Sequence, residues 1–262
     1  MSESASRFSR VELFDTYFTN ARRAEACDEI ERLIAANDRC HLVCVKDVAL
    51  LMRSRSDSFL RQFYERFPEY IFADGRGVVW ASRLLGEPLV EMVGGPGIYY
   101  EMLRRAATKG YKVYLLGTRD DVLQRAVANL KKRLPTLSLV GCHHGYFDQD
   151  SEYRVVESIL RAAPQVLFIG MSTPRREQFI ATHLRSLLPG VCLPIGGVLD
   201  VEAGTTRLAP GIVGKLGLEW LYRLLQEPRR LGPRYLRTHP RFIWAVFQAV
   251  IERATAGDRV RR

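Results

Sequence analysis

The sequence predicts an α/β fold, in which a mainly parallel, doubly wound sheet is followed by a basic helical appendage. Over the first 200 residues, short apolar runs alternate with stretches of helical periodicity. Such alternation is typical of βαβ units, which build a parallel sheet covered by helices on both faces. After about residue 204 the chain becomes basic and is punctuated by proline and glycine. We therefore expect a Rossmann-like core over residues 1–204 and an appendage over residues 205–262.

Six apolar runs predict the strands of the sheet. Each is five to seven residues long, which is the length of a buried strand. Several end in glycine, which suits a tight turn from a strand into a helix. In chain order they are HLVCVK (41–46), YIFADG (70–75), YKVYLLG (111–117), LSLVG (137–141), QVLFIG (165–170) and VCLPIGG (191–197).

The segments between these runs predict helices. In LQRAVANLKKRL (123–134), for example, apolar residues recur at spacings of three and four. The core helices are expected at 76–86, 97–109, 120–133, 151–162 and 175–187. In the appendage we expect one helix from 215 to 226, ending before Pro228 because the residue before a proline avoids the α region. A second appendage helix is expected over 240–254, too short to span a bilayer.

Composition limits the class of protein. The chain has 262 residues and a formal net charge of +10, and residues 205–262 carry 12 Lys and Arg against 4 Asp and Glu. This balance favours polyanions, anionic lipid or phosphorylated substrates. The five cysteines form no CxxC pair, so neither a disulfide framework nor a zinc site is indicated, and a reducing cytoplasm fits. We expect no signal peptide and no membrane span.

Ligands of doubly wound sheets bind beyond the carboxyl ends of the strands, which directs attention to the residues after each run. Asp74 ends one run and precedes two glycines in FADGRG. It is a candidate general base that takes a proton from a substrate hydroxyl. An ordinary helix-capping or turn aspartate is the alternative.

The stretch GGPG (94–97) opens a predicted helix, where backbone amides can bind phosphate. A simple turn is the alternative. The dinucleotide fingerprint GxGxxG fails because Tyr100 occupies its last position. No GxxxxGK[ST] loop occurs either, which argues against a Walker-type nucleotidase.

Two further motifs have both a chemical and an ordinary interpretation. DQD (148–150) imitates the metal-binding DxD of nucleotide-sugar transferases, but an acidic helix cap explains it as well. STPRREQF (172–179) places Arg175 and Arg176 where they could pair with phosphate, and Glu177 where it could orient a sugar hydroxyl. Ordinary chemistry at a helix start explains these residues too.

The basic appendage has three interpretations. It can be a solvated charged face, it can bind nucleic acid, or it can lie on a membrane surface. No nucleic-acid-binding module is visible in the sequence. Aromatic residues interleaved with arginines suit an interfacial element, and arginine also grips a diphosphate with two hydrogen bonds. The two uses are compatible if the substrate is a lipid diphosphate.

Six segments of the sequence carry a resemblance to a known family. In chain order they are DGRGVVW, VYLLGTRDDVL, VGCHHGYF, VLFIGMSTPRREQFI, PIGGVLDVEAGTTRLAP and GLEWLYRLLQEPRRLGPRYL. Taken together and in this order, they resemble the WecG/TagA/CpsF family of bacterial glycosyltransferases. The resemblance covers roughly residues 40–240, and its last block is the most specific. It implies an inverting transferase that moves a hexose or N-acetylhexosamine from a UDP-sugar to a saccharide on a polyprenyl diphosphate. The implied location is peripheral, on the cytoplasmic face of the inner membrane.

Residue by residue, the resemblance implies that Asp74 is the catalytic base and that appendage arginines enter the active site while the appendage meets an anionic membrane. The sequence departs from the family pattern at Cys44 and Lys46, where many members have Thr-x-Asn, and at Arg176, where glutamine is usual. Within the family, it is most similar to members that make xanthan-type exopolysaccharide. This implies β-1,4 transfer of glucose from UDP-glucose to glucosyl-diphospho-undecaprenol, with N-acetylmannosaminyl transfer to a lipid-linked N-acetylglucosamine as the alternative.

The sequence therefore predicts an active site that needs no metal or other cofactor, and a protein with no nucleic-acid partner that could form a homo-oligomer. A basic nucleic-acid-binding protein is the rival from another class, and the broken fingerprint disfavours a nicotinamide-dependent oxidoreductase. The candidate substrate-binding residues besides the base Asp74 are Cys44, Lys46, Gly95, Gly97, Gly117, Arg175, Arg176, Glu177, Arg207, Arg223, Arg229, Arg230 and Arg234.

Overall fold

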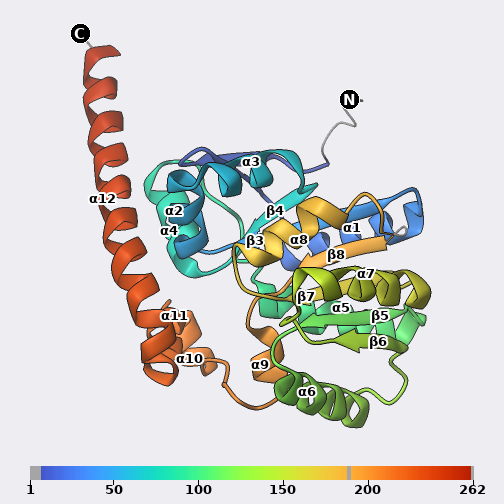
Figure 1. Ribbon diagram of the computed structural model, residues 1–262. Helices are drawn as coiled ribbons and strands as arrows, with labels where there is room; N and C mark the ends of the chain where they lie inside the picture. Colours follow the sequence, from blue (N-terminus) through green and yellow to red (C-terminus); the bar gives the residue numbers. More distant parts are fainter. Residues whose placement is uncertain (1–6, 188–189, 261–262) are drawn as a thin grey trace.

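The structure, a computed structural model, describes residues 7–187 and 190–260. Its centre is a six-stranded, all-parallel sheet in the order β4-β3-β8-β7-β5-β6 (Figure 1). The strands are β3 (Cys40–Lys46), β4 (Tyr70–Ala73), β5 (Val113–Gly117), β6 (Leu139–His143), β7 (Val166–Gly170) and β8 (Gly190–Pro194). Each corresponds to one of the predicted apolar runs, so the α/β parallel-sheet prediction is confirmed.

Helices cover both faces of the sheet and create one large apolar core on each face. One core joins α1 (Arg23–Ala36), α5 (Gly95–Lys109), α6 (Asp120–Arg133) and α9 (Val198–Glu202) to one face. The other joins α2 (Val48–Ser56), α3 (Ser58–Arg66), α4 (Arg76–Leu84), α7 (Gln149–Ala162) and α8 (Arg175–His183) to the opposite face. Alternate strand residues enter alternate cores, as Leu42 and Val43 do, because strand side chains point to opposite faces in turn.

The N-terminal elements were not predicted. An antiparallel hairpin of β1 (Arg10–Leu13) and β2 (Thr16–Thr19) packs near β4, and its apolar residues Leu13 and Phe18 join the core on the α2 side. Phe14 and Asp15 form its turn with positive φ angles. The helices α1, α2 and α3 also went unassigned in the sequence, although all three contribute buried side chains.

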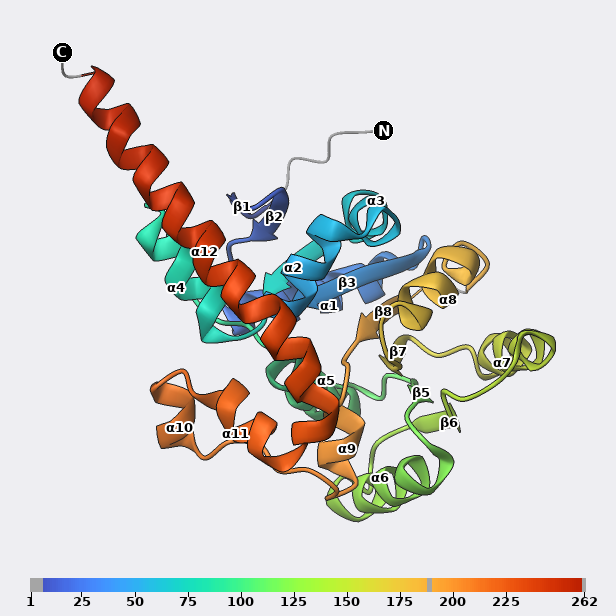
Figure 2. The same ribbon diagram turned by 60° about the vertical axis from the view of Figure 1, so that its left-hand side comes forward.

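The appendage differs most from the sequence-based expectation. It consists of α10 (Gly211–Lys215), α11 (Glu219–Gln226) and α12 (Pro228–Val260), and α12 runs as one long helix beside the body of the molecule (Figures 1 and 2). The expectation of a helix starting only at 240 is wrong, because Pro233 and Pro240 lie inside α12. Both prolines are exposed, so water can satisfy the carbonyls that lose their intrahelical partners.

The appendage is seated on the core by packing at several points. A Cβ added to Gly217 would lie 2.3 Å from the Trp80 ring, so the turn before α11 rests against α4. Phe242 is buried and meets Phe14 edge-to-face, with 5.9 Å between ring centroids. Within the described ranges 7–187 and 190–260, no helix is both long and apolar enough to cross a membrane.

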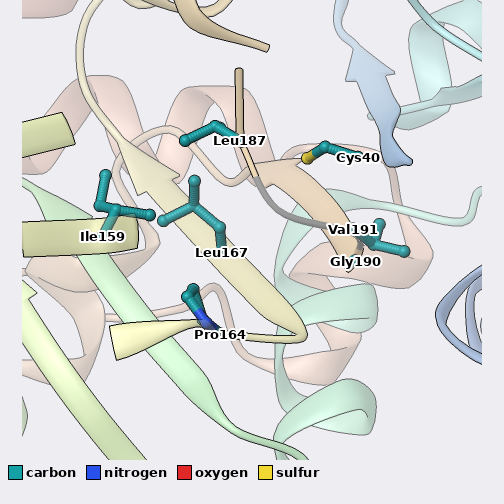
Figure 3. Close-up of a pocket in the computed structure, with 7 residues that line it drawn as sticks. All are labelled: Cys40, Ile159, Pro164, Leu167, Leu187, Gly190 and Val191. Atoms are coloured by element: carbon teal, nitrogen blue, oxygen red, sulfur yellow. The ribbon is translucent and has the colours of Figure 1, made fainter. Parts of the chain in front are cut away.

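Figure 3 shows a small apolar cavity lined by Cys40, Ile159, Pro164, Leu167, Leu187, Gly190 and Val191. Its volume of about 10 Å³ is close to the room that one water needs. Cys40 and Gly190 begin their strands, so the cavity lies at the amino ends of the sheet. Substrate chemistry is expected at the opposite edge.

Candidate active site

Two aspartates follow neighbouring strands at the carboxyl edge of the sheet. Asp47 follows β3 and Asp74 follows β4, and the two strands pair in parallel with Lys46 opposite Ala73. The Asp74 amide donates to the Lys46 carbonyl at 3.0 Å, which continues the ladder by one residue. The two carboxylates therefore share one end of the sheet, where the appendage also arrives.

The Asp74 carboxylate is aimed at the start of α5. Its Oδ1 accepts a hydrogen bond from the Gly95 amide at 3.3 Å, and the side chain is half-buried. Burial, followed by the charge of Asp47, raises the pKa of Asp74 to about 6, while the Gly95 amide and Arg223 act in the opposite direction. A carboxylate with this pKa is suited to take up a proton near neutral pH.

Asp74 does not cap α4, the helix that follows it. The N-cap of α4 is Gly75, which has a φ of 92° and makes no side-chain capping bond. A β-carbon is strained in that region of φ, so glycine lets the chain turn sharply directly after Asp74. The turn leaves the carboxylate at the strand end and facing α5.

Two appendage arginines reach the same edge from α11 and α12. A Cβ added to Gly197, just after β8, would lie 3.1 Å from an Arg223 guanidinium nitrogen and 3.7 Å from one of Arg230. It would also lie 3.2 Å from Asp200 Oδ2. Glycine at 197 therefore leaves room for both guanidinium groups, and Arg223 lies near enough to Asp74 for its charge to act on that carboxylate.

The other appendage arginines are placed differently. Arg234 forms an ion pair with Asp47, with the side chains 38% and 34% exposed. Arg229 and Arg207 are exposed, as is Arg230, which also forms an ion pair with Glu227. Gln226 binds the Arg207 backbone through hydrogen bonds of 2.8 and 3.0 Å, which ties the segment before α10 to α11.

Two glycines of GGPG, and Gly117 after them, make close contacts within the protein. The Gly95 amide, a candidate phosphate ligand, binds Asp74. At Gly97 an added Cβ would lie 2.4 Å from Arg23 Nε, and that Nε donates to the Val93 carbonyl at 2.9 Å. Gly117 has a φ of 139°, and a Cβ there would lie 2.4 Å from the Gly170 carbonyl carbon, so close strand packing explains this glycine.

The three departures from the family pattern come together in the fold. Cys44, Lys46 and Arg176 are all buried, and they surround Tyr64 and Glu177. Lys46 Nζ donates to Thr16 and Ser54 at 3.0 Å each and lies 4.3 Å from the centroid of the Tyr64 ring. Lys46 also lines a cavity of about 500 Å³ between the β1–β2 hairpin and α3, so its side chain faces the hairpin.

Glu177 is the centre of a buried network. Its Oε1 accepts from Tyr64 at 2.8 Å, from Thr173 at 3.0 Å and from Arg176. Burial acts to raise the pKa of Glu177, but the Arg176 charge and the Tyr64 hydroxyl outweigh it and hold the pKa below its usual value. Burial raises the pKa of the Cys44 thiol to about 12. These residues neutralise and bind one another, and they fix the turn after β7.

The residues of the remaining motifs make local contacts in the structure. Arg175 stacks over the Phe147 ring at 4.7 Å. Asp148 caps α7 by accepting from the Ser151 amide at 2.8 Å, and Asp150 lies in the first turn of that helix. In the part of the chain that the structure describes, no three His, Cys, Asp or Glu residues form a group that could hold a metal ion.

Sequence reasoning missed several residues at this edge. Asp47 follows β3 just as Asp74 follows β4, so its position after a strand was the signal that could have found it. Thr118 directly follows β5 and Asp200 lies in the first turn of α9, and the two share a hydrogen bond of 3.1 Å. Arg23 carries no such signal, because its role depends on α1 packing beside α5.

Comparison with known proteins gives one family over nearly the whole chain. The sequence profile described as "Glycosyl transferase WecG/TagA/CpsF family" matches residues 11–256. Proteins from Staphylococcus aureus strains MW2 and NCTC 8325 / PS 47 are each 31% identical over 249 residues, which is 94% of this chain and 96% of the relative. Both are named N-acetylglucosaminyldiphosphoundecaprenol N-acetyl-beta-D-mannosaminyltransferase.

Proposed function

Because this chain belongs to the WecG/TagA/CpsF family of glycosyltransferases, we propose that it transfers N-acetylmannosamine from a UDP-sugar to N-acetylglucosamine carried on a polyprenyl diphosphate. The observation that carries the proposal is the half-buried Asp74 at the carboxyl edge of the sheet, beside a cationic appendage. The names of the relatives support this acceptor and this sugar. They do not support the glucosyl, xanthan-type transfer that was the first expectation from the sequence.

In the proposed reaction, Asp74 takes the proton from the acceptor hydroxyl as its oxygen attacks the anomeric carbon. A new carbon–oxygen bond forms on one face of the sugar, and the bond to UDP breaks on the other with its electron pair going to the diphosphate. Asp74 later returns the proton to water. A single displacement of this kind inverts the anomeric configuration.

The appendage arginines supply the complementary charge. Arg223 and Arg230 converge on the Gly197 turn, and guanidinium groups bind diphosphate oxygens with two parallel hydrogen bonds. Fixed cations at the place where charge develops stabilise the transition state without reorganising during the reaction. We assign these two arginines to the leaving diphosphate, and this assignment requires a docked appendage.

The exposed side chains of the appendage suggest where the lipid lies. Large apolar residues are exposed along all three helices, among them Ile212, Leu216, Leu225, Leu236, Ile243, Trp244 and Phe247. Exposed apolar and aromatic residues beside arginines are typical of elements that lie in a membrane interface. We propose peripheral attachment to an anionic leaflet on the cytoplasmic side. This attachment would bring the lipid-linked acceptor to the catalytic edge, by which we mean the carboxyl edge of the sheet at Asp47 and Asp74.

The test is a donor panel with purified protein and a short-chain N-acetylglucosaminyl-diphospho-polyprenol, with and without a metal chelator. We expect transfer from UDP-N-acetylmannosamine, loss of transfer by about a hundredfold or more in Asp74→Asn, and no effect of the chelator. Asp148→Asn is the matched control, because it makes the same change of side chain and asparagine keeps the cap of α7. Transfer of glucose to a glucosyl-diphospho acceptor would restore the first expectation, and salt-dependent nucleic-acid binding without any transfer would refute the proposal.

A further inference from the structure

One ion pair links the C-terminal appendage to the catalytic edge. Arg234, on α12, donates to Oδ2 of Asp47, which follows β3. The other Asp47 carboxylate oxygen, Oδ1, accepts from the Leu50 amide at 2.7 Å and caps α2. The Asp47 carboxylate therefore caps α2 and also binds the appendage.

The neighbours of this pair place it at the site. Burial, and then the charge of Asp47, raise the pKa of Tyr235, and Arg223, Arg234 and Asp74 act on the same hydroxyl. Tyr235 packs against His239, with 4.5 Å between ring centroids, and both rings contact Trp220 of α11. The segment that carries Arg234 is thus packed against α11, which carries Arg223.

Arg234 binds Asp47 through one side of its guanidinium group. Its Nε is buried and makes no hydrogen bond among the described residues, while its Nη2 is bound to Asp47. The appendage also contacts the core at other points, and α12 packs along α2. Trp80 packs on Gly217, Phe242 packs on Phe14, and Arg253 pairs with Glu87.

We propose that Asp47 is a positioning residue whose ion pair with Arg234 holds α11 and α12 against the catalytic edge, so that Arg223 faces Asp74. This inference rests on the proposed function and assigns a regulatory contact to the same site. Arg234 then acts on the substrate only through Asp47, in contrast to the diphosphate-binding role that the sequence predicts for it. When the pair is broken, Arg223 and Arg230 move away from the edge together.

The test uses a double-mutant cycle in the full-length protein, with Asp47→Asn, Arg234→Gln and the double variant. Asparagine caps a helix about as well as aspartate, so Asp47→Asn removes the charge and keeps the start of α2. Appendage docking is measured by hydrogen exchange over residues 219–250, a readout that does not depend on sugar transfer. Transfer is followed separately, with kcat and KM resolved.

Two matched controls are available in the chain. Asp57→Asn changes the equivalent cap of the next helix, where Asp57 accepts from the Leu60 amide at 3.1 Å. Arg237→Gln removes an exposed cation one turn further along α12. Neither variant should alter exchange over residues 219–250 or the rate of transfer.

We expect each single variant to speed exchange in α11 and the first half of α12 by roughly three- to tenfold, because a half-exposed ion pair contributes modestly. The double variant should show no further increase, and kcat should fall in parallel. Additive effects would overturn the proposal. So would a raised acceptor KM in Arg234→Gln alone, because Arg234 would then bind the substrate. If no donor is transferred by the wild type, the proposed function fails while the exchange data still decide whether the pair holds the appendage.

Discussion

The Asp74 carboxylate accepts a hydrogen bond from the Gly95 amide, with 3.3 Å between Oδ1 and N. The amide-rich start of α5, a candidate phosphate site, is thus used to aim the predicted base. An amide that binds the charged form of a carboxylate lowers its pKa, and here it opposes the larger effects of burial and of Asp47. The base is oriented before any substrate binds.

These opposing effects on the pKa of Asp74 predict how the rate of sugar transfer depends on pH. Asp74 acts as a base only when it is deprotonated, so kcat/KM should rise with pH through the pKa of Asp74, which is about 6. Burial, Asp47 and Glu219 raise that pKa, whereas the Gly95 amide and Arg223 lower it. Removing the cation in Arg223→Gln should therefore move the acidic limb to higher pH, as measured by a pH–rate profile of both proteins. A limb that stays in place would show that Arg223 does not face Asp74.

The buried pair of Arg176 and Glu177 predicts a loss of stability upon substitution. Arg176 is 7% exposed and Glu177 is fully buried, so Glu177→Gln leaves an uncompensated guanidinium in the core. We expect the free energy of unfolding to fall by about 3 kcal/mol in chemical denaturation. The control is Glu157→Gln, which removes an exposed pair with Arg161 and should cost less than about 1 kcal/mol. Unchanged stability with a raised donor KM would instead favour the substrate-binding role predicted from the sequence.

The environment of His41 predicts that the free energy of unfolding depends on pH near neutrality. Its ring is buried between Asp38 at 2.8 Å and Glu69 at 3.3 Å, and hydrogen bonding to Glu69 raises the pKa of His41 above its usual value. A raised histidine pKa contributes stability that is complete below the unfolded pKa of about 6.5 and is lost as pH rises through the folded pKa. The destabilisation caused by His41→Gln should thus be larger at pH 6 than at pH 9, as measured by urea unfolding at both values. A pH-independent difference would exclude a charged His41.

The sequence was sufficient for the sheet because each buried strand is a short apolar run bounded by turn residues, as in QVLFIG around β7. It was not sufficient for β1 and β2, whose four-residue strands depend on packing against the core. The prolines of α12 misled the prediction for a local reason. Pro233 and Pro240 are exposed, where a lost backbone hydrogen bond costs little.

Site residues that a local sequence pattern marks could be predicted, whereas those that depend on contacts between distant parts of the chain could not. Asp74 could be singled out because its position directly after a strand places it at the carboxyl edge of the sheet. The burial of Arg176 and Glu177 was not foreseen, because it depends on Tyr64 from a helix more than a hundred residues earlier in the chain. The pairing of Arg234 with Asp47 is equally non-local, since the two residues are 187 positions apart.

The exposed aromatic residues of α12 predict how the protein meets a membrane. Trp244 and Phe247 lie one turn apart on α12 and are exposed, with 5.7 Å between their ring centroids. Replacing both by serine removes apolar area from the surface and leaves the core unchanged, so binding to vesicles that contain anionic lipid should weaken by about tenfold or more. The measurement is co-sedimentation with vesicles of phosphatidylglycerol and phosphatidylethanolamine, together with transfer to the lipid-linked acceptor. Tyr153→Ser is the control, because Tyr153 is an even more exposed aromatic residue and lies on α7 of the core. The double variant should retain its thermal stability, since neither ring is buried. Unchanged vesicle binding would place the membrane contact elsewhere, and equal weakening by Tyr153→Ser would show that the binding is not confined to the appendage.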